Sequence, residues 1–381
     1  MPTGSSIRTG CLIAASSSES SDILYATGFS AADEFICADL PEGRRVAVVS
    51  SLELQRARKE VRPGVEVMDR AGIMRSRKVP AGEKNFFVCL SRYFDIGCWL
   101  VPERFPLAYA DKLRQAGIAV QAVSGDFFPE RAVKRPDEIE HIREAMKVTQ
   151  DAMYQVQDFL KDSTVGPDGV LIWHEKPLTC EYIRSEIEAE FKRRGYSAER
   201  TIIACGADAS APHCIGSGPV RAHETLVADI FPRCDATGYW GDMTRTFVKG
   251  KASPVAKKAF DAVLLASNKV LSALRQGVTG KDMHLLAAAI LEEAGFRTGL
   301  DGNGVPCGFF HGLGHGVGLD IHENPRLSPA NPSPLKAGGV VSVEPGLYDP
   351  SWGGIRLEDL AVIREDTCEN LCTMPKELEI S

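Results

Sequence analysis

Three histidines stand close together in the segment FFHGLGHGVGLDIHENP, at His311, His315 and His322. Glycine alternates with other residues from 312 to 318, and so much glycine disfavours a helix. Strand or loop backbone that passes close to a neighbouring segment is therefore expected. In an extended strand His311 and His315 share a face, whereas His322 needs a turn or bulge to join them. Converging imidazoles could bind a metal or move protons; three unrelated loop residues are the alternative.

Four carboxylates lie in or beside apolar, strand-like runs: Asp229 in LVADIF, Asp242 in YWGDMTRTFV, Glu344 in VVSVEPGLY and Glu358 in GGIRLEDLAVI. Turn residues between Asp229 and Asp242 predict a β-hairpin. A buried carboxylate is costly unless it has a partner, so these acids either pair with cations or share a metal. Together with His315 they form an oxygen-rich set that suits Mn²⁺, Co²⁺, Fe²⁺ or Zn²⁺ rather than a thiolate site.

An internal repeat predicts how these residues are positioned. The segments Thr179–Tyr196 and Thr279–Phe296 each run from a threonine N-cap to a glycine-aromatic stop at the same spacing. A long helix is expected before each copy, over Asp137–Lys161 and Ser253–Arg275, and strand-like segments follow each copy. Two such halves predict a duplicated α/β domain whose helices flank one curved antiparallel sheet around a pseudo-two-fold axis. Chance similarity between two amphipathic helices is the alternative.

The first 130 residues alternate apolar runs with helical stretches, a pattern typical of an α/β domain with a partly parallel sheet. Among these runs, Asp22–Gly28 and Arg45–Val49 are interpreted as strands. We expect an N-terminal α/β domain over residues 1–130 and a catalytic domain over 135–375, with the boundary near Pro129–Pro136.

Composition limits the function classes. The net charge is -7, from 44 basic and 51 acidic residues, and no basic block suggests nucleic-acid binding. No window has the length and apolarity of a membrane span, and the N-terminus lacks the apolar run of a signal peptide. Eleven scattered cysteines suit a reducing compartment. We therefore expect a cytoplasmic protein that binds neither nucleic acid nor membrane.

The motifs GYWGDMTRTF, HGLGHGVGLDIHENP, VEPGLY and GGIRLED resemble, in order, the four motifs of the pita-bread metallopeptidases. That family includes methionine aminopeptidase, Xaa-Pro aminopeptidase and prolidase. The similarity covers about Lys134 to Ile363, and LYATGFS more loosely resembles the creatinase/prolidase N-terminal domain. The resemblance implies an α/β (α+β) protein with a C-terminal pita-bread fold, a creatinase-like N-terminal domain and a homodimer.

The resemblance also implies five ligands for two divalent metal ions. They are Asp242 and Glu358, which bridge both ions, His315 and Glu344, which complete one ion, and Asp229, which holds the other. The family usually spaces its two aspartates more closely than the 13 residues found here. We interpret this difference as a longer hairpin loop, with Asp235 as the competitor for the place of Asp229. Manganese is the expected metal, with cobalt, zinc or iron as alternatives.

The implied activity is hydrolysis of the N-terminal Xaa-Pro bond of a peptide with proline at the second position. Two metals can share one water and hold it as hydroxide. Glu344 is the candidate to shuttle the proton to the leaving amine. His213 and His322 resemble family histidines that contact substrate, and His311 and Arg356 resemble residues of the Xaa-Pro-cleaving members.

Other activities remain open on this evidence. A methionine aminopeptidase or another aminopeptidase could share the fold, and the motifs do not separate a dipeptidase from an aminopeptidase. Creatinase, which acts without metal, and a non-catalytic peptide-binding module are both disfavoured because all five ligand positions are present.

Overall fold

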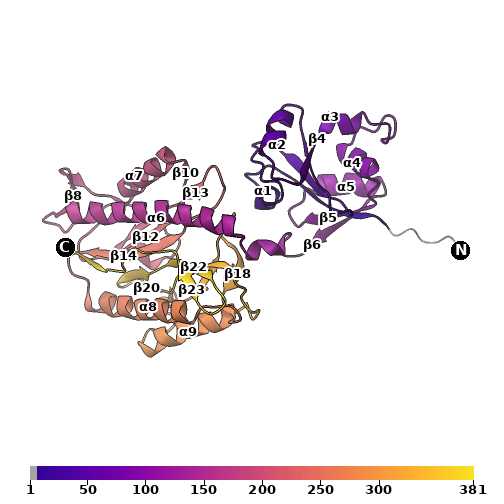
Figure 1. Cartoon of the computed structure of the whole chain (residues 1–381). Helices are drawn as coiled ribbons and strands as arrows, with labels where there is room; N and C mark the ends of the chain where they lie inside the picture. The colour runs from indigo at the N-terminus through magenta and orange to yellow at the C-terminus, as the bar shows by residue number, and fades with distance from the viewer. Residues whose placement is uncertain (1–6) are drawn as a thin grey trace. The chain divides into compact units, whose positions relative to one another are not determined.

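The computed structural model describes residues 7–381 and divides into two compact units, 1–129 and 130–381 (Figure 1). Each unit has its own sheet and core, and each is described separately below. Among the described residues, no helix is long and apolar enough to cross a membrane.

The first unit is built on a six-stranded mixed sheet with the strand order β4-β3-β2-β1-β5-β6. β1 pairs antiparallel with β2, and β2 with β3, whereas the outer pairs and β1–β5 are parallel. The strands are β1 (Thr9–Ala15), β2 (Phe35–Asp39), β3 (Arg45–Val49), β4 (Val65–Asp69), β5 (Cys98–Pro102) and β6 (Ala119–Val123). The helices are α1 (Ser21–Thr27), α2 (Leu54–Glu60), α3 (Arg70–Met74), α4 (Phe86–Phe94) and α5 (Leu107–Gln115).

The strand predicted over Asp22–Gly28 is wrong, because this segment forms the helix α1. The Ser20 side chain accepts a hydrogen bond from the backbone N of Ile23, which caps the first turn. Gly28 ends the helix in the left-handed conformation at φ 67, which costs little in glycine. The serine N-cap and the glycine C-cap both indicate a short helix, whereas the apolar residues alone fit a helix or a strand equally well.

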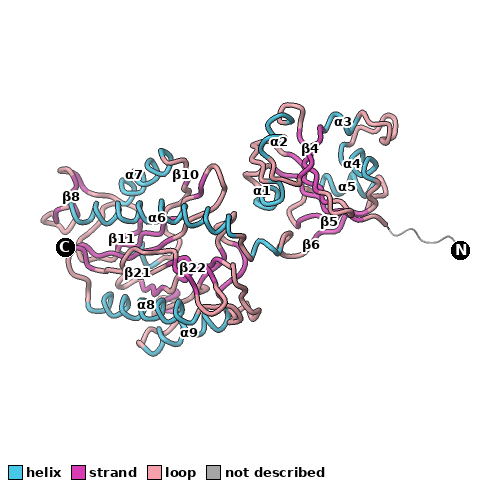
Figure 2. Tube along the Cα trace, viewed as in Figure 1, coloured by secondary structure: helices cyan, strands magenta, loops and turns pink. Residues whose placement is uncertain are grey.

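In the second unit, four helices form two pairs (Figure 2). They are α6 (Pro136–Asp162), α7 (Cys180–Arg193), α8 (Pro254–Ala273) and α9 (Gly280–Glu293). The two short helices begin alike, since Thr179 accepts a hydrogen bond from Tyr182 N at 3.2 Å and Thr279 from Asp282 N at 3.0 Å. α7 and α9 each span 14 residues, as the repeat predicted. In Figure 1, α6 and α7 lie on one side of the strands and α8 and α9 on the other.

Two sheets fill the space between the helix pairs. One has the strand order β11-β12-β14-β24 and the other β18-β17-β19-β22-β23. Their strands are β11 (Ile202–Cys205), β12 (Leu226–Ile230), β14 (Met243–Lys249) and β24 (Glu379–Ile380), and β17 (Gly314–Gly316), β18 (Glu323–Leu327), β19 (Val340–Val343), β22 (Asp359–Ile363) and β23 (Cys368–Asn370). Smaller ladders join β7 (Thr164–Val165), β8 (Leu171–Trp173) and β9 (Lys176–Pro177), β10 (Tyr196–Ser197) with β13 (Arg233–Cys234), β15 (Gly299–Leu300) with β16 (Pro306–Cys307), and β20 (Gly346–Asp349) with β21 (Gly353–Arg356).

The single curved antiparallel sheet expected from the repeat is therefore divided. A backbone bridge between Thr244 and Glu358 connects its two parts, and β24 pairs parallel with β14. Pro345 lacks a backbone N–H, so pairing along β19 stops just before it, and the next residues turn into the β20–β21 hairpin. The two sheets therefore meet at this single backbone bridge between Thr244 and Glu358.

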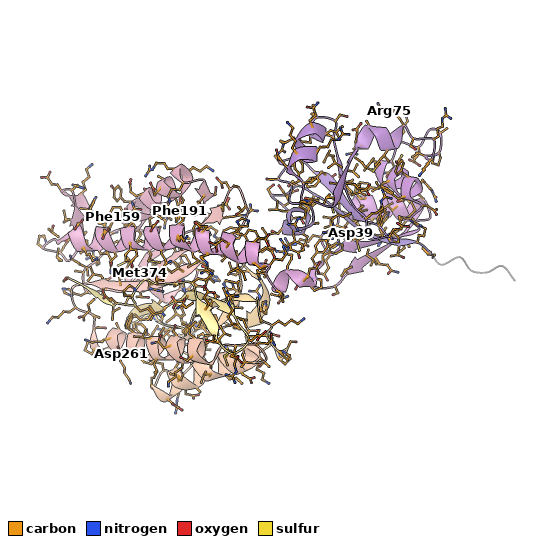
Figure 3. All side chains as sticks on the ribbon, viewed as in Figure 1. Asp39, Arg75, Phe159, Phe191, Asp261 and Met374 are labelled. Atoms are coloured by element: carbon orange, nitrogen blue, oxygen red, sulfur yellow. The ribbon has the colours of Figure 1, made fainter. Side chains whose placement is uncertain are left out.

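The core of the second unit lies between the sheets and their covering helices. α8 buries Val263, Ala266 and Val270 against strands that include β19 and β22. Figure 3 shows the contrast between Asp261, on the exposed side of α8, and the buried rings of Phe159 on α6 and Phe191 on α7. The helices thus present one apolar face each to the sheets, and this packing fixes the strands that carry the acidic residues.

Candidate metal centre

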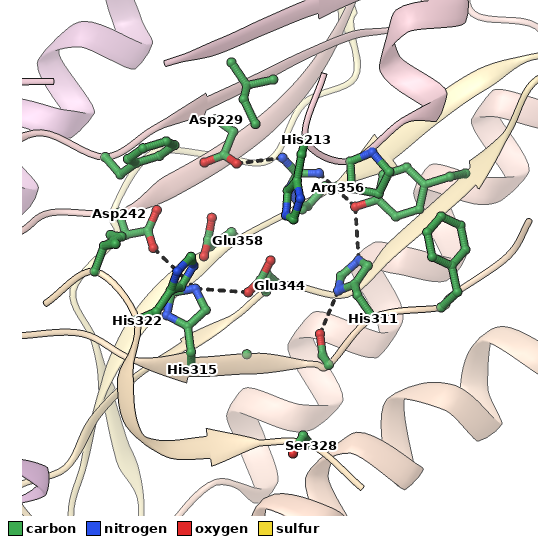
Figure 4. Close-up of a pocket in the computed structure, with 18 of the residues that line it drawn as sticks. His213, Asp229, Asp242, His311, His315, His322, Ser328, Glu344, Arg356 and Glu358 are labelled. Atoms are coloured by element: carbon green, nitrogen blue, oxygen red, sulfur yellow. Dashed lines mark hydrogen bonds and ion pairs between the residues drawn. The ribbon is translucent and has the colours of Figure 1, made fainter. Parts of the chain in front are cut away.

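The five predicted ligands all lie in the second unit, at the ends of strands that meet between the two sheets (Figure 4). Asp229 lies in β12, Asp242 directly before β14, His315 in β17, Glu344 directly after β19 and Glu358 between β21 and β22.

The glycines around His315 have a steric purpose. A Cβ at Gly314 would lie 2.0 Å from the Ser342 carbonyl oxygen, and one at Gly316 would lie 2.4 Å from that of Asn324. Only glycine allows β17 to pass this close to its two neighbouring strands. The predicted close approach of the glycine-rich segment is confirmed, and it buries His315 between strands.

Asp242, His315 and Glu358 each offer a ligand atom within 4.8 Å of the other two. His315 Nε2 lies 3.7 Å from Asp242 Oδ2 and 3.2 Å from Glu344 Oε1. The Thr244 hydroxyl donates to Glu358 Oε2 at 2.7 Å, and this bond orients the carboxylate. Four of the five side chains therefore converge directly.

The fifth side chain, Asp229, is bound to Arg356, whose Nη2 donates to Asp229 Oδ2 at 2.6 Å. Its other oxygen, Oδ1, is buried and has no hydrogen-bond partner among residues 7–381. Asp235 points elsewhere, with its carboxylate bound to Lys192 Nζ at 2.9 Å and Ser197 Oγ at 2.6 Å. The structure thus places Asp229 in the site and Asp235 outside it, and the longer loop includes β13.

The electrostatics of the site are those of crowded acids. Burial, together with the charges of Glu358, Asp229 and Glu344, raises the pKa of Asp242 well above its usual value. Burial and the charges of Glu344 and Asp229 likewise raise the pKa of Glu358. Each of these two carboxyls is thus harder to ionise because it is buried beside other carboxylates.

The pKa of Glu344 shifts in the opposite direction. Burial opposes its ionisation, but the hydrogen bond with His315 and the nearby positive charge outweigh burial and lower the Glu344 pKa to about 2. The site thus combines one carboxyl whose pKa is lowered, Glu344, with two whose pKa values are raised, Asp242 and Glu358.

These residues fit a divalent cation. A cation would neutralise the repelling carboxylates of Asp242 and Glu358 and would satisfy the unpartnered Asp229 Oδ1. His315 Nδ1 lies 3.2 Å from the Gly316 carbonyl oxygen. A proton on Nδ1 donates to that carbonyl, and a cation that takes the place of the proton between Nε2 and Glu344 Oε1 would bind the Nε2 lone pair, as a metal ligand requires.

A chain of hydrogen bonds extends from Asp229 to His311. Arg356 Nη1 donates to the Tyr348 hydroxyl at 2.8 Å, and that hydroxyl lies 3.1 Å from His311 Nε2. His311 Nδ1 lies 2.7 Å from the Gly312 carbonyl oxygen and must donate to it. Tyr348 therefore donates to Nε2 of a neutral His311, consistent with the pKa that burial lowers at this imidazole.

The same residues line a cavity of about 820 Å³. Its apolar wall comprises Ile202, Phe231, Phe310 and Ile321, and its polar wall includes His213, His322, Arg326 and Ser328. The His322 ring lies 4.4 Å from that of His315. Desolvation, with the charges of His315 and Arg326, lowers the pKa of His322 to about 4, so its imidazole is neutral at pH 7.

Sequence reasoning missed Tyr348, Thr244 and Arg326. Tyr348 was missed because an aromatic residue in an apolar strand is usually part of the core. In the structure it is fully buried, and its hydroxyl links Arg356 to His311. The sequence did offer one indication: Tyr348 lies only four residues after Glu344, on the strand β20 that leads away from the site. Thr244 lies two residues from Asp242 on the same strand face, where period-two alternation could have identified it.

Comparisons with known proteins agree with this geometry. Residues 140–365 match the metallopeptidase family M24. A Xaa-Pro dipeptidase from Pyrococcus furiosus is 32% identical over 249 residues, which cover 65% of this chain and 65% of that relative's length.

Solved structures match over nearly the whole chain. An X-Pro aminopeptidase from Thermotoga maritima superposes with a TM-score of 0.79 at 25% identity, covering 98% of both chains. A prolidase from Pyrococcus horikoshii has a TM-score of 0.78 at 25% identity and covers 97% of this chain and 95% of its own. The predicted fold class, a mixed α/β protein with the pita-bread fold, is confirmed.

Proposed function

Because the chain belongs to the metallopeptidase family M24, we propose that it is a two-metal exopeptidase that hydrolyses the N-terminal Xaa-Pro bond of short peptides. The observation that carries the proposal is the convergence of Asp242, His315 and Glu358 within 4.8 Å in the wall of a largely apolar cavity. The names of the dipeptidase and aminopeptidase relatives support the same substrate class.

In this proposal two divalent ions are held between five side chains: Asp229, Asp242, His315, Glu344 and Glu358. Bound there, the ions would lower the pKa of a water molecule and polarise the scissile carbonyl. Manganese is the proposed metal because oxygen ligands with one imidazole suit it, with cobalt, zinc or iron as alternatives.

The side chains of the protein supply binding and proton transfer. Glu344, ionised through its contact with His315, can accept a proton from the attacking water and pass it to the proline nitrogen as the C–N bond breaks. His322, neutral at pH 7, can hydrogen-bond the substrate at the cavity wall. His213 lies at the more exposed side of the cavity and can contact the chain beyond the cleaved bond.

His311 and Arg356 act differently from a free base. Both nitrogens of His311 already have partners, Tyr348 and Gly312. We propose that His311 and Arg356 hold Tyr348 at the cavity wall, where the hydroxyl can exchange its bond for one to substrate. Burial raises the pKa of Tyr348 to about 12, so it remains a donor at neutral pH.

The apolar wall suits a proline ring, whose nitrogen carries no hydrogen in the scissile amide. Arg326 lines the same cavity and offers a cation to a free carboxylate, so dipeptides are the first substrates to test. The test compares Gly-Pro with Gly-Ala, Gly-Pro-Ala and Met-Ala-Ser, before and after metal removal. Cleavage of Xaa-Pro bonds, abolished by chelation and restored by Mn²⁺, supports the proposal.

Brisk release of methionine from Met-Ala-Ser, with Xaa-Pro peptides untouched, would favour a methionine aminopeptidase. Asp235→Asn is the matched control for the variant Asp229→Asn, because Asp229 lines the cavity and Asp235 does not.

We also propose that the protein forms a homodimer, on the basis of family resemblance. Light scattering at micromolar concentration tests this proposal.

A further inference from the structure

The ligands come from two sheets, so something must hold the sheets in register at the site. Asp229 and Asp242 belong to the sheet of β12 and β14, and Glu358 leads into β22 of the other sheet. The sheets meet at the bridge between Thr244 and Glu358, where Glu358 N donates to Thr244 O at 3.0 Å. Glu358 is itself a proposed metal ligand and Thr244 lies two residues after Asp242, so this crossing point joins the segments that carry two of the proposed ligands.

Arg245 lies behind the crossing and contacts both strands. Its Nη1 donates to Thr244 O at 2.9 Å and to Glu358 O at 2.8 Å. Its Nη2 donates to Asp359 Oδ1 at 2.8 Å and to Met374 O at 3.0 Å. The side chain is 1% exposed, and side chains alternate along a strand, so it lies on the face opposite Thr244.

The hydrogen-bond donors of the Arg245 guanidinium are not all satisfied. Arg245 Nε is buried without a hydrogen-bond partner among residues 7–381, which costs free energy relative to a fully satisfied group. Buried ion pairs such as Arg245–Asp359 contribute little net stability when compared with apolar residues of similar volume. Nη1 instead joins the carbonyls of Thr244 and Glu358, while the bonds of Nη2 to Asp359 and Met374 fix the plane of the guanidinium; a flexible ammonium has no second nitrogen to fix it in this way.

We propose that Arg245 is a positioning residue that sets the separation of Asp242 and Glu358 by clamping the backbone of Thr244 to that of Glu358. This inference rests on the metal site of the proposed function. If the clamp loosens, the hydrogen bond from the Thr244 hydroxyl to Glu358 Oε2 lengthens, and the carboxylate loses its orientation. Loss of such supporting contacts typically weakens metal binding by about 10–100-fold.

Lys376 provides a matched control. It pairs with Asp359 Oδ2, which also accepts from Asn370 Nδ2 at 2.8 Å. Lys376 therefore shares the carboxylate partner of Arg245 and lies two residues after Met374, which accepts a hydrogen bond from Arg245. Among residues 7–381 it has no hydrogen bond or ion pair with Thr244 or Glu358, so its loss should affect the fold without changing the clamp.

The test titrates metal-free protein with Mn²⁺ by calorimetry and records the thermal midpoint of each variant. Arg245→Met should weaken Mn²⁺ binding by at least about tenfold, whereas Lys376→Met should stay within about threefold of wild type even if its midpoint falls. Arg245→Lys keeps the charge but not the fork, and should lie between them. Wild-type Mn²⁺ affinity in Arg245→Met would overturn the proposal and leave Arg245 a structural residue only.

If Arg245→Met does not fold, Arg245→Lys decides: a loss of Mn²⁺ affinity beyond that of Lys376→Met supports the clamp, and equal affinities overturn it. Saturating metal adds a second readout, since kcat on Gly-Pro should fall more than KM rises. Metal binding needs no peptide, so absence of Xaa-Pro cleavage by wild-type protein would contradict the proposed function and leave this test intact.

Discussion

Replacing Asp242 by asparagine removes one charge from the acidic cluster and almost nothing from its volume. The ligand atoms of Asp242 and Glu358 lie within 4.8 Å of each other. Two unit charges at that distance repel by about 3 kcal/mol at an effective dielectric constant of about 20. Metal-free Asp242→Asn should therefore be more stable than metal-free wild type when both carboxyls are ionised.

The pH dependence follows from the raised pKa of Asp242. Above the usual carboxyl pKa, the folded protein binds more protons than the unfolded chain, so wild-type stability falls as pH rises through the raised value. At lower pH, where the Asp242 carboxyl is protonated, the variant should gain little. At higher pH, where both carboxyls are ionised, the gain should approach the full repulsion, or about 6–12 °C in midpoint for a unit of this size.

Differential scanning calorimetry of chelator-treated protein at pH 5 and pH 9 measures this difference. Added Mn²⁺ should raise the midpoint of wild type and not that of Asp242→Asn. Asp235→Asn, which changes an exposed aspartate bound to Lys192, should respond to Mn²⁺ as wild type does. A variant less stable than wild type at both pH values without metal would refute the argument that Asp242 lies in a repulsive field.

Three further substitutions test other parts of the site. Tyr348→Phe breaks the link between Arg356 and His311 and should lower kcat about tenfold with metal content unchanged, by elemental analysis; loss of metal would contradict this role. His322→Ala should lower kcat/KM by roughly 10²-fold, again with metal retained, and a change under threefold would exclude a substrate contact. Glu323→Gln removes the charge that pairs with buried Lys134 and with Arg131, each 2.7 Å away, and should cost about 3–5 kcal/mol in urea unfolding; a cost below about 1 kcal/mol would contradict a stabilising role for this charge.

The site residues could be identified from sequence because their chemistry conflicts with their surroundings. Asp229 and Glu344 interrupt or end apolar runs, and a carboxylate there needs a partner. The glycines beside His315 likewise indicate backbone in close contact. Such conflicts are local, so one sequence is enough to reveal them. Their assignment as metal ligands stays a prediction until metal is measured.

The remaining features depend on contacts between distant segments. The strand predicted over Asp22–Gly28 failed because a short apolar run suits a buried strand and a buried helix equally. Tyr348 and Arg245 acquire their roles from partners far away in the chain, Arg356 and Glu358 among them. The division of the sheet into two parts that meet only at Thr244 and Glu358 also follows from tertiary packing, which periodicity does not encode.

Anomalous diffraction from crystals grown with Mn²⁺ is the most direct test of the two-metal centre. The account predicts two anomalous peaks enclosed by the five proposed ligands: Asp229, Asp242, His315, Glu344 and Glu358. Peaks bound by other residues, or a single peak at full metal saturation, would contradict it.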